Sequence, residues 1–287
     1  MSVHDHSAGG TSGIVLLFGL PFALAALLYC GGVGVQLRSG RRWPWYRTLS
    51  WLTGAGAAAF AFVGPLVSAP QGFVPHMWSH LLAGMLAPVL LVIARPVTLA
   101  LRSLHVRRAR QISRVLRSRP VGFLVSPAVA TLLNLGGMWA LYRTDLYEWM
   151  QVSLLLHLAV MTHVLFAGVL FTVAVIPFDP SPHRASFPTR LLVLVAALAA
   201  HNVLAKLIYA SPPDGVPVVD GRAGALIMYY GGDVVDAVLL TVLCAQWYRQ
   251  AGHPSRERIR PARRRRRPPV RSARGRATTT QRAPSGS

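Results

Sequence analysis

The chain has 287 residues, of which 53% are hydrophobic and only 14% are charged. A soluble domain carries about 25% charged residues, so this composition argues against an ordinary soluble protein and places the chain in a membrane. The formal net charge is +21, but 13 arginines follow Tyr248. The 13 arginines and Glu257 of residues 249–287 give +12 of this charge, so more than half of it belongs to the end of the chain rather than to its hydrophobic part.

Long apolar runs define the fold class. About 20 apolar residues cross a bilayer core of roughly 30 Å, which predicts an all-α integral membrane protein built as a bundle of seven transmembrane helices. Residues 1–13 are predicted to be a flexible extracytoplasmic N-terminus, 14–248 the membrane domain, and 249–287 a disordered, arginine-rich cytoplasmic tail. The predicted spans are residues 14–37, 47–68, 76–101, 120–142, 149–176, 188–211 and 223–248.

Arginines gather in alternate connections between these spans and predict the orientation. The positive-inside rule gives an N-terminus outside and a cytoplasmic C-terminus. No basic region and no small-residue cleavage site precedes the first span, so we expect that helix to be retained. The basic loops and the tail are expected to contact anionic lipid head groups, and nothing in them requires a nucleic acid. The arginines of the two basic loops are Arg38, Arg41, Arg42 and Arg47, then Arg102, Arg107, Arg108, Arg110, Arg114, Arg117 and Arg119.

The third span opens with two histidines that are the first candidate ligands. His76 and His80 are four residues apart with Met77 between them, and about 20 mostly apolar residues lead to an Arg95–Pro96 break. On a helix the two imidazoles lie one turn apart on the same face. Such a pair is typical of either a metal entrance or an ordinary anchor at the head-group level.

Further polar residues occur at similar predicted depths on later spans. At roughly 1.5 Å per residue, His157 lies about 12 Å from the outer surface, His201 and Asp233 about 15 Å, and His163 about 21 Å. His76 and His80 lie within about 8 Å of it. Ionisable groups inside a membrane are costly, so these residues are functional candidates. The simpler interpretations are a helix–helix hydrogen bond for His157 and a buried ion pair of Asp233 with Lys206. His157 and His163 are rotated apart and less suited to one ion.

The residue types favour copper. Imidazole suits both copper oxidation states and thioether favours Cu(I), whereas a tight zinc site more often uses cysteine or a third histidine. Haem is the main rival, because histidines from facing helices can ligate iron axially. We find no nucleophile–base constellation, phosphate loop or dinucleotide fingerprint, so the sequence predicts no enzyme.

Three blocks of the sequence resemble the CtaG family of cytochrome c oxidase assembly factors. The first is HMWSHLLAGMLAPVLLVIARPVTLALR, with two histidines opening a helix. The second runs from HLAVMTHVLFAGVLF through the D-P loop to HNVLAKLIYA, and the third is DGRAGALIMYYGGDVVDAVLLTVLCAQW. The match covers about residues 14–250. Family members often have tryptophan at the position of Tyr229 and glutamate at that of Asp233, and a second acid such as Asp236 is unusual.

The resemblance implies a multi-pass protein of the bacterial plasma membrane that helps assemble a haem-copper terminal oxidase, with oxidase subunits as partners and copper as a transient cargo. The family's recurrent polar positions correspond to His76, His80, His157, His163, His201 and Asp233.

We therefore expect His76 and His80, with Met77, to receive copper at the outer face. His157 and His201 would hold it deeper, and Asp233 would balance charge. Three other functions fit the same residues: a haem-binding electron-transfer protein, a copper or proton transporter, and a scaffold that binds no metal. A transporter would use Asp233, Asp236 and Lys206 as its relay.

Overall fold

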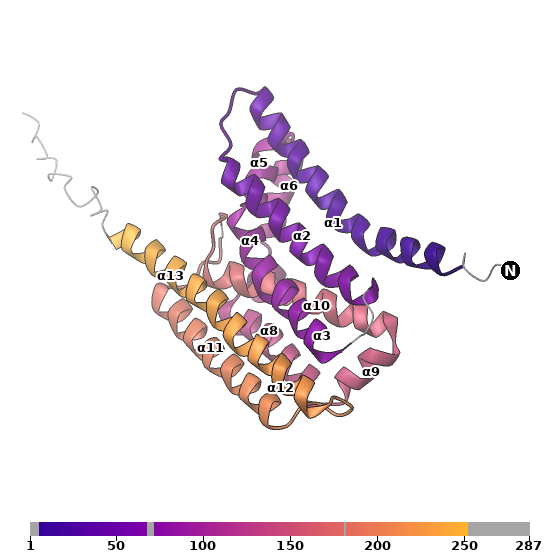
Figure 1. The fold of residues 1–287 in the computed structure, drawn as a ribbon. Coiled ribbons are helices and arrows are strands. Elements are labelled where there is room, and N and C mark those ends of the chain that lie inside the picture. Colours follow the sequence, from indigo (N-terminus) through magenta and orange to yellow (C-terminus); the bar gives the residue numbers. More distant parts are fainter. Residues whose placement is uncertain (1–5, 68–71, 181, 252–287) are drawn as a thin grey trace, which may run out of the picture. The chain divides into compact units, whose positions relative to one another are not determined.

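The computed structural model describes residues 6–67, 72–180 and 182–251, and every regular element in these ranges is a helix (Figure 1). The prediction of an all-α protein is therefore confirmed for the described residues. The helices are α1 (His6–Arg38), α2 (Trp45–Val67), α3 (Phe73–His80), η1 (Leu81–Leu86), α4 (Ala87–Ile93), α5 (Pro96–Ser103), α6 (Val106–Leu116), α7 (Arg119–Leu124), α8 (Pro127–Arg143), α9 (Leu146–Val152), α10 (Leu154–Val175), α11 (Phe187–Ala210), α12 (Val218–Leu226), η2 (Ile227–Gly231) and α13 (Gly232–Ala251).

Five helical stretches of the described residues are long and apolar enough to cross a membrane. The other two predicted spans correspond to α2, which is rich in glycine and alanine, and to α8, which has only 17 residues. The count of seven spans and the orientation therefore stay predictions. The five stretches are Phe18–Arg38, Phe73–Ile93, Leu154–Val175, Phe187–Ala210 and Val218–Gln250.

The predicted third span ends earlier than residue 101, at the Arg-Pro break. Pro96 disfavours the right-handed helical conformation in the residue before it, and Arg95 adopts a left-handed conformation with φ 55°. The chain then turns into the separate helix α5. The Asp179 carboxylate, from the loop after α10, accepts hydrogen bonds from the first free amides of α5, Val97 N (3.2 Å) and Thr98 N (2.8 Å). A carboxylate at a helix N-terminus stabilises both these amides and the helix dipole.

Two segments have the wider π-helical geometry, and both interrupt candidate spans. Segment η1 follows His80 directly and precedes Pro88, which cannot donate the hydrogen bond that would close onto Gly84. Segment η2 precedes Gly232 and Asp233. Short π segments within α-helices occur frequently at functional sites. Each one rotates the following turns, so residues beyond it occupy a different face from the one that regular helical spacing predicts.

Helix α10 lies at the centre of the helical bundle, where it packs against η1, α4, α8 and α11. The stretch Phe73–Ile93 is similarly enclosed, whereas α1 lies at the edge, with 6% of its span buried. The chain divides into two units, Met1–Tyr248 and Arg249–Ser287. Residues 1–5 of the predicted N-terminal segment and 252–287 of the predicted tail lie outside the described residues.

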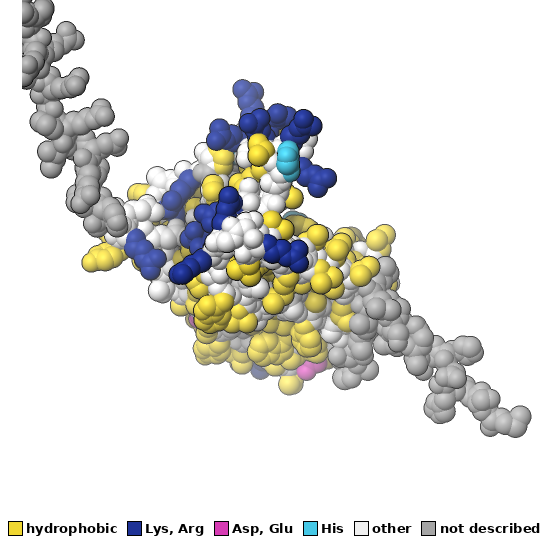
Figure 2. Space-filling view, turned by 90° about the horizontal axis from the view of Figure 1, so that it is seen from above, with side chains coloured by type: hydrophobic (Ala, Val, Ile, Leu, Met, Phe, Trp, Pro, Cys, Tyr) yellow, Lys and Arg dark blue, Asp and Glu magenta, His cyan; other side chains and the backbone are white. Residues whose placement is uncertain are grey.

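One face of the bundle is strongly basic. Figure 2 shows arginine side chains gathered over α5, α6 and the connection between α1 and α2, with hydrophobic side chains around them. These are the basic loops that the sequence predicts to be cytoplasmic. The histidines of the candidate site lie on other segments: on α3, α10 and α11.

Candidate functional site

The two histidines of α3 are both buried, with exposed fractions of 6% for His76 and 2% for His80. A pair at the head-group level would be partly exposed, so the structure favours neither a simple interfacial anchor nor an open receiving point. The burial arises because α3 packs against α2, α12 and η2. Buried polar side chains are normally hydrogen-bonded, so the partners of each ring nitrogen decide what the residue can do.

His76 lies in an aromatic cage and has one polar partner. Its Nε2 is 3.0 Å from the hydroxyl of Tyr142, at the end of α8. The Phe73 and Tyr147 rings complete the cage, and the Tyr147 ring centroid is 5.1 Å from that of the imidazole. Burial raises the pKa of the Tyr147 phenol, which lies in α9, to about 12. The phenol therefore stays neutral at physiological pH, and the cage offers no counter-charge to a metal ion.

His80 has no hydrogen bond at either ring nitrogen, although both atoms are buried. A side chain at Gly84, one turn further on in η1, would come within 3.3 Å of its Cε1. The imidazole therefore uses the space that this glycine leaves. His80 is close enough to interact electrostatically with His201 on α11, and His76 does so with both His80 and His157. Four histidines from three helical segments thus form one continuous series.

His201, on α11, is also buried, with an exposed fraction of 4%, and again both ring nitrogens are unpartnered. A Cβ atom at Gly232, where α13 begins after η2, would overlap the imidazole ring. Gly232 is therefore the residue that lets α13 approach α11 at this level. His201 also interacts electrostatically with Asp233. The Oδ1 of Asp233 accepts a hydrogen bond of 3.1 Å from Asn202.

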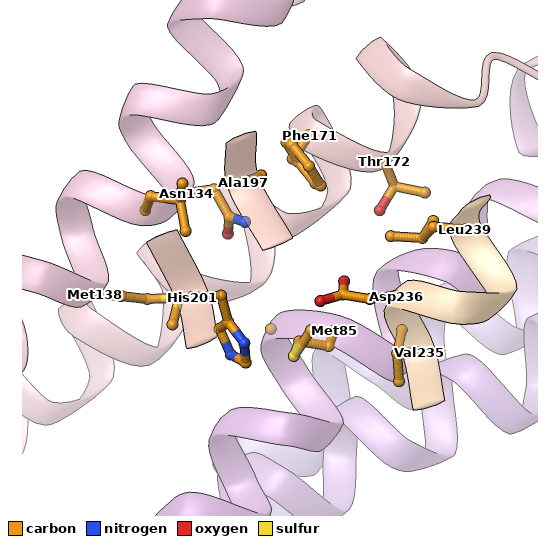
Figure 3. A pocket seen from close by; sticks show the side chains of 12 residues that line it. Met85, Asn134, Met138, Phe171, Thr172, Ala197, His201, Val235, Asp236 and Leu239 are labelled. Carbon is orange, nitrogen blue, oxygen red and sulfur yellow. The ribbon is translucent and has the colours of Figure 1, made fainter. Parts of the chain in front are cut away.

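A small cavity of about 30 Å³, lined by four polar side chains among mostly apolar ones, lies next to His201. Figure 3 shows Asn134, Thr172, His201 and Asp236 converging on it from four helices, with Met85 at its edge. Asp236 is 4% exposed, and its Oδ2 has no hydrogen-bond partner. A water needs roughly 10–15 Å³ of such space and two or more polar partners. The cavity can therefore hold one or two waters or a single small ion.

The other predicted site residues are not brought to this cavity. His163 is exposed, and its Nε2 lies 3.0 Å from the Leu133 carbonyl of α8. Met77 is fully buried in a hydrophobic cluster with Phe73 and Met228. The predicted ion pair of Asp233 with Lys206 is not formed among the described residues: Asp233 accepts from Asn202, and the Lys206 ammonium lies 5.6 Å from the Tyr229 ring centroid.

The sequence predicts no metal role for Asp236 or Tyr142. It places Asp236 only in a possible transport relay and gives no role to Tyr142. An acid three residues after Asp233 in an apolar run was the available signal for the first, while nothing in the sequence pairs Tyr142 with His76. The described residues contain no group of three or more His, Cys, Asp or Glu side chains arranged to hold a metal ion.

Comparisons with known proteins bear on the whole chain. The model of a family described as cytochrome c oxidase caa3 assembly factor matches residues 27–250. Uncharacterized proteins of Mycobacterium bovis and Mycobacterium tuberculosis are each 30% identical over 263 residues, which is 84% of this chain and 38% of theirs. One of Mycobacterium leprae is 28% identical over 256 residues, 82% of this chain and 39% of its own. The chain thus spans about two fifths of the length of these curated relatives. No solved structure matches it.

Proposed function

The chain belongs to the family of cytochrome c oxidase caa3 assembly factors, and from this premise we propose that it carries copper for a haem-copper terminal oxidase. In this proposal the protein lies in the bacterial plasma membrane, takes up copper from the outer side and releases it to an oxidase subunit. Copper is the cargo of the protein. The role is one of assembly and involves no catalysed reaction.

The observation that carries this proposal is the series of buried histidines with free ring nitrogens. His80 and His201 have four unpartnered ring nitrogens between them, and the Nε2 of His157 is also unpartnered. Leaving buried polar atoms without partners costs about 1–3 kcal/mol each. A protein that tolerates this cost on neighbouring imidazoles is expected to use them for a ligand, and neutral imidazole is a good copper ligand.

The arrangement of the histidines suits a copper ion that is passed on to a partner more than a metal that stays bound as a cofactor. Because no group of three or more ligands is assembled among the described residues, a copper ion would meet one or two imidazoles at a time. His76 would exchange its Tyr142 hydrogen bond for the metal, and His80 and His201 would take it deeper. The Asp236 carboxylate would supply negative charge at the inner end of the series. Weak, successive binding favours release to a partner over retention.

The small cavity also bears on the haem alternative. Pockets for drug-sized ligands and cofactors have volumes of roughly 300–1,000 Å³, whereas the cavity beside His201 has about 30 Å³. This volume favours a single ion over a macrocycle. A visible spectrum of the purified protein tests the point directly, because haem would give a Soret band and copper carried on histidines would not.

The central experiment combines rescue of oxidase assembly with copper loading. We expect His80→Ala/His201→Ala to lose most of the Cu(I) bound by the purified full-length protein and to fail to restore oxidase activity in a deletion strain. His76→Ala/His80→Ala should behave similarly. Two matched controls are His105→Ala, in an exposed basic connection, and His163→Ala, whose ring bonds the Leu133 carbonyl. Both should load copper and rescue assembly as the unchanged protein does.

Three outcomes would count against the proposal. Unchanged copper stoichiometry in both double variants would remove the histidines as ligands. Full rescue by variants that no longer bind copper would instead support a scaffold that binds oxidase subunits without metal. Uptake of copper into proteoliposomes that is abolished by Asp233→Asn would favour a transporter over a carrier.

A further inference from the structure

A second cavity, separate from the histidine series, lies at the arginine-bearing end of the bundle. Its volume is about 320 Å³, within the roughly 300–1,000 Å³ of small-molecule pockets. It is enclosed by α4, α5, α7, α10 and the loop that follows α10. The lining is almost entirely apolar, and it includes Val92, Val97, Val121, Val169, Val173 and Phe178. Apart from Trp51, Asp179 and His183 the described residues of the lining have no polar side chain, so the pocket suits a hydrocarbon chain.

The mouth of this pocket adjoins a group of arginines. Phe178, Asp179 and Pro180 line both the apolar pocket and a neighbouring depression that contains Arg95, Arg102 and Arg184. On the other side, Leu116, Pro180 and Pro182 are shared with a depression that contains Arg117. The hydrophobic space therefore opens directly beside several guanidinium groups.

The positive charge of the arginines at the mouth is only partly compensated. Among the described residues that line this depression, Asp179 is the one carboxylate beside three arginines, and it accepts hydrogen bonds from Val97 N, Thr98 N and the Thr98 hydroxyl. No ion pair among the described residues joins it to Arg95, whose guanidinium lies 5.5 Å from the centroid of the Phe178 ring. The local charge is thus positive, and the neighbouring face is strongly basic (Figure 2).

We propose that this composite pocket binds an anionic phospholipid, with one acyl chain in the apolar cavity and the phosphate against Arg95, Arg102 and Arg184. Three observations select this occupant over other apolar molecules. The pocket borders α10 and the stretch Phe73–Ile93, which are both long and apolar enough to span a membrane. Its lining is mostly hydrocarbon-like, and the residues beside it are cationic. Basic pockets between membrane helices are a recurrent way of binding anionic lipid head groups. The inference is independent of any role in copper handling.

The test uses the purified full-length protein, stripped of lipid in detergent and then titrated with phosphatidylglycerol or phosphatidylcholine. Native mass spectrometry counts the lipids retained. We expect stronger retention of phosphatidylglycerol, and a weakening of about fivefold for each arginine removed, hence about 25-fold in Arg102→Gln/Arg184→Gln. Arg143→Gln, an exposed arginine at the end of α8, is the matched control and should bind as the unchanged protein does.

A second variant tests the cavity separately from the charge. Val169→Trp fills the apolar space and should abolish retention of both lipids. Val203→Trp, at a half-exposed position on α11, adds the same side chain elsewhere and should change nothing. Circular dichroism checks that each variant keeps its helices. If Val169→Trp unfolds the protein, Val173→Phe replaces it as the cavity-filling variant.

Inorganic phosphate separates a lipid site from a simple anion site. If phosphate at millimolar concentration displaces phosphatidylglycerol completely, or if phosphatidylcholine binds equally well, the proposal is wrong. The proposal is also wrong if the double arginine variant and the Val169→Trp variant each retain as much phosphatidylglycerol as the unchanged protein. Phosphate that competes weakly, with loss of binding in both kinds of variant, supports it.

Discussion

The two faces of α10 border cavities of opposite character. On one face Phe171 and Thr172 line the small cavity of about 30 Å³, where unpartnered nitrogen and oxygen atoms point inward. On the other face Val169 and Val173 line the apolar pocket of about 320 Å³. The first cavity has polar groups without partners and room for an ion, while the second has room for a hydrocarbon chain and a lining that is mostly apolar. One helix thus separates a site suited to charge from a site suited to hydrocarbon.

The difference in volume between the two cavities has a local cause in the packing of α10. A Cβ atom at Gly168 would overlap the Gly84 carbonyl and lie 2.8 Å from Pro88, so α10 and η1 touch through their backbones. The cavity beside His201 is small because these two segments cannot be separated without loss of that contact. On the opposite face the neighbours are the short helices α5, α6 and α7, which do not follow α10 along its length. The following substitutions test this difference, from the largest expected effect to the smallest.

Gly168→Ala should have the largest effect, because the new methyl group must push η1 away from α10. We expect a loss of about 3 kcal/mol in the free energy of unfolding and an enlarged polar cavity. Denaturant titration in detergent measures the first. Gly136→Ala is the control, since its nearest neighbour is Leu132 Cδ1 at 3.5 Å, and it should stabilise by about 0.5–1 kcal/mol. Equal effects of the two changes would contradict the proposed backbone contact.

Asp179→Ala tests the side of α10 that borders the apolar pocket. It removes the hydrogen bonds that hold the start of α5, and charged hydrogen bonds contribute about 1.5–3 kcal/mol. We expect a loss of about 2 kcal/mol and weaker lipid retention, measured by unfolding and by native mass spectrometry. Asp145→Ala is the control, because Asp145 precedes α9 without capping it by a side-chain hydrogen bond. A loss no greater than that of the control would show that α5 does not depend on this carboxylate.

Asp236→Asn should stabilise the fold and weaken copper binding. The carboxylate has a buried oxygen with no partner, and a neutral side chain of the same shape relieves this cost. We expect the free energy of unfolding to rise by about 1.5 kcal/mol, while Cu(I) retention falls. Thermal unfolding and copper analysis of the same sample provide both values. A destabilised protein with normal copper content would mean that Asp236 has a structural partner instead.

Tyr142→Phe should have the smallest effect, a loss of about 1 kcal/mol from the hydrogen bond to His76. Copper binding should be kept or slightly strengthened, because the His76 Nε2 becomes free. Tyr230→Phe, at a position 65% exposed, is the control and should be neutral in both measurements. If Tyr142→Phe abolishes copper binding while the fold is intact, the phenol takes part in holding the metal.

Most of the helical layout follows from the sequence, because apolar runs and their breaks are local properties. The family resemblance is confirmed over residues 27–250. The sequence marks a break at Arg95–Pro96 but extends the third span through it to residue 101, whereas the structure ends that helix at Ile93. The predicted spans overlap the five candidate membrane helices but extend too far at residues 94–101 and 149–153. Regular helical spacing puts His201 and Asp233 at a common depth. The two π-helical segments are not visible in the sequence, because they depend on how the helices pack.

The composition, the positions of the basic loops and the order of the three motif blocks, all properties of the sequence, determined that this is a helical membrane protein of the oxidase assembly family. Only the tertiary structure decided which polar atoms have partners. His163 and His201 look equivalent in sequence, yet one reaches the Leu133 carbonyl and the other lines a cavity together with Asp236, whose Oδ2 has no partner. The physical reason is that hydrogen bonding and burial depend on which neighbour a helix face meets. Glycines such as Gly168 and Gly232 set those contacts through close packing between segments distant in sequence.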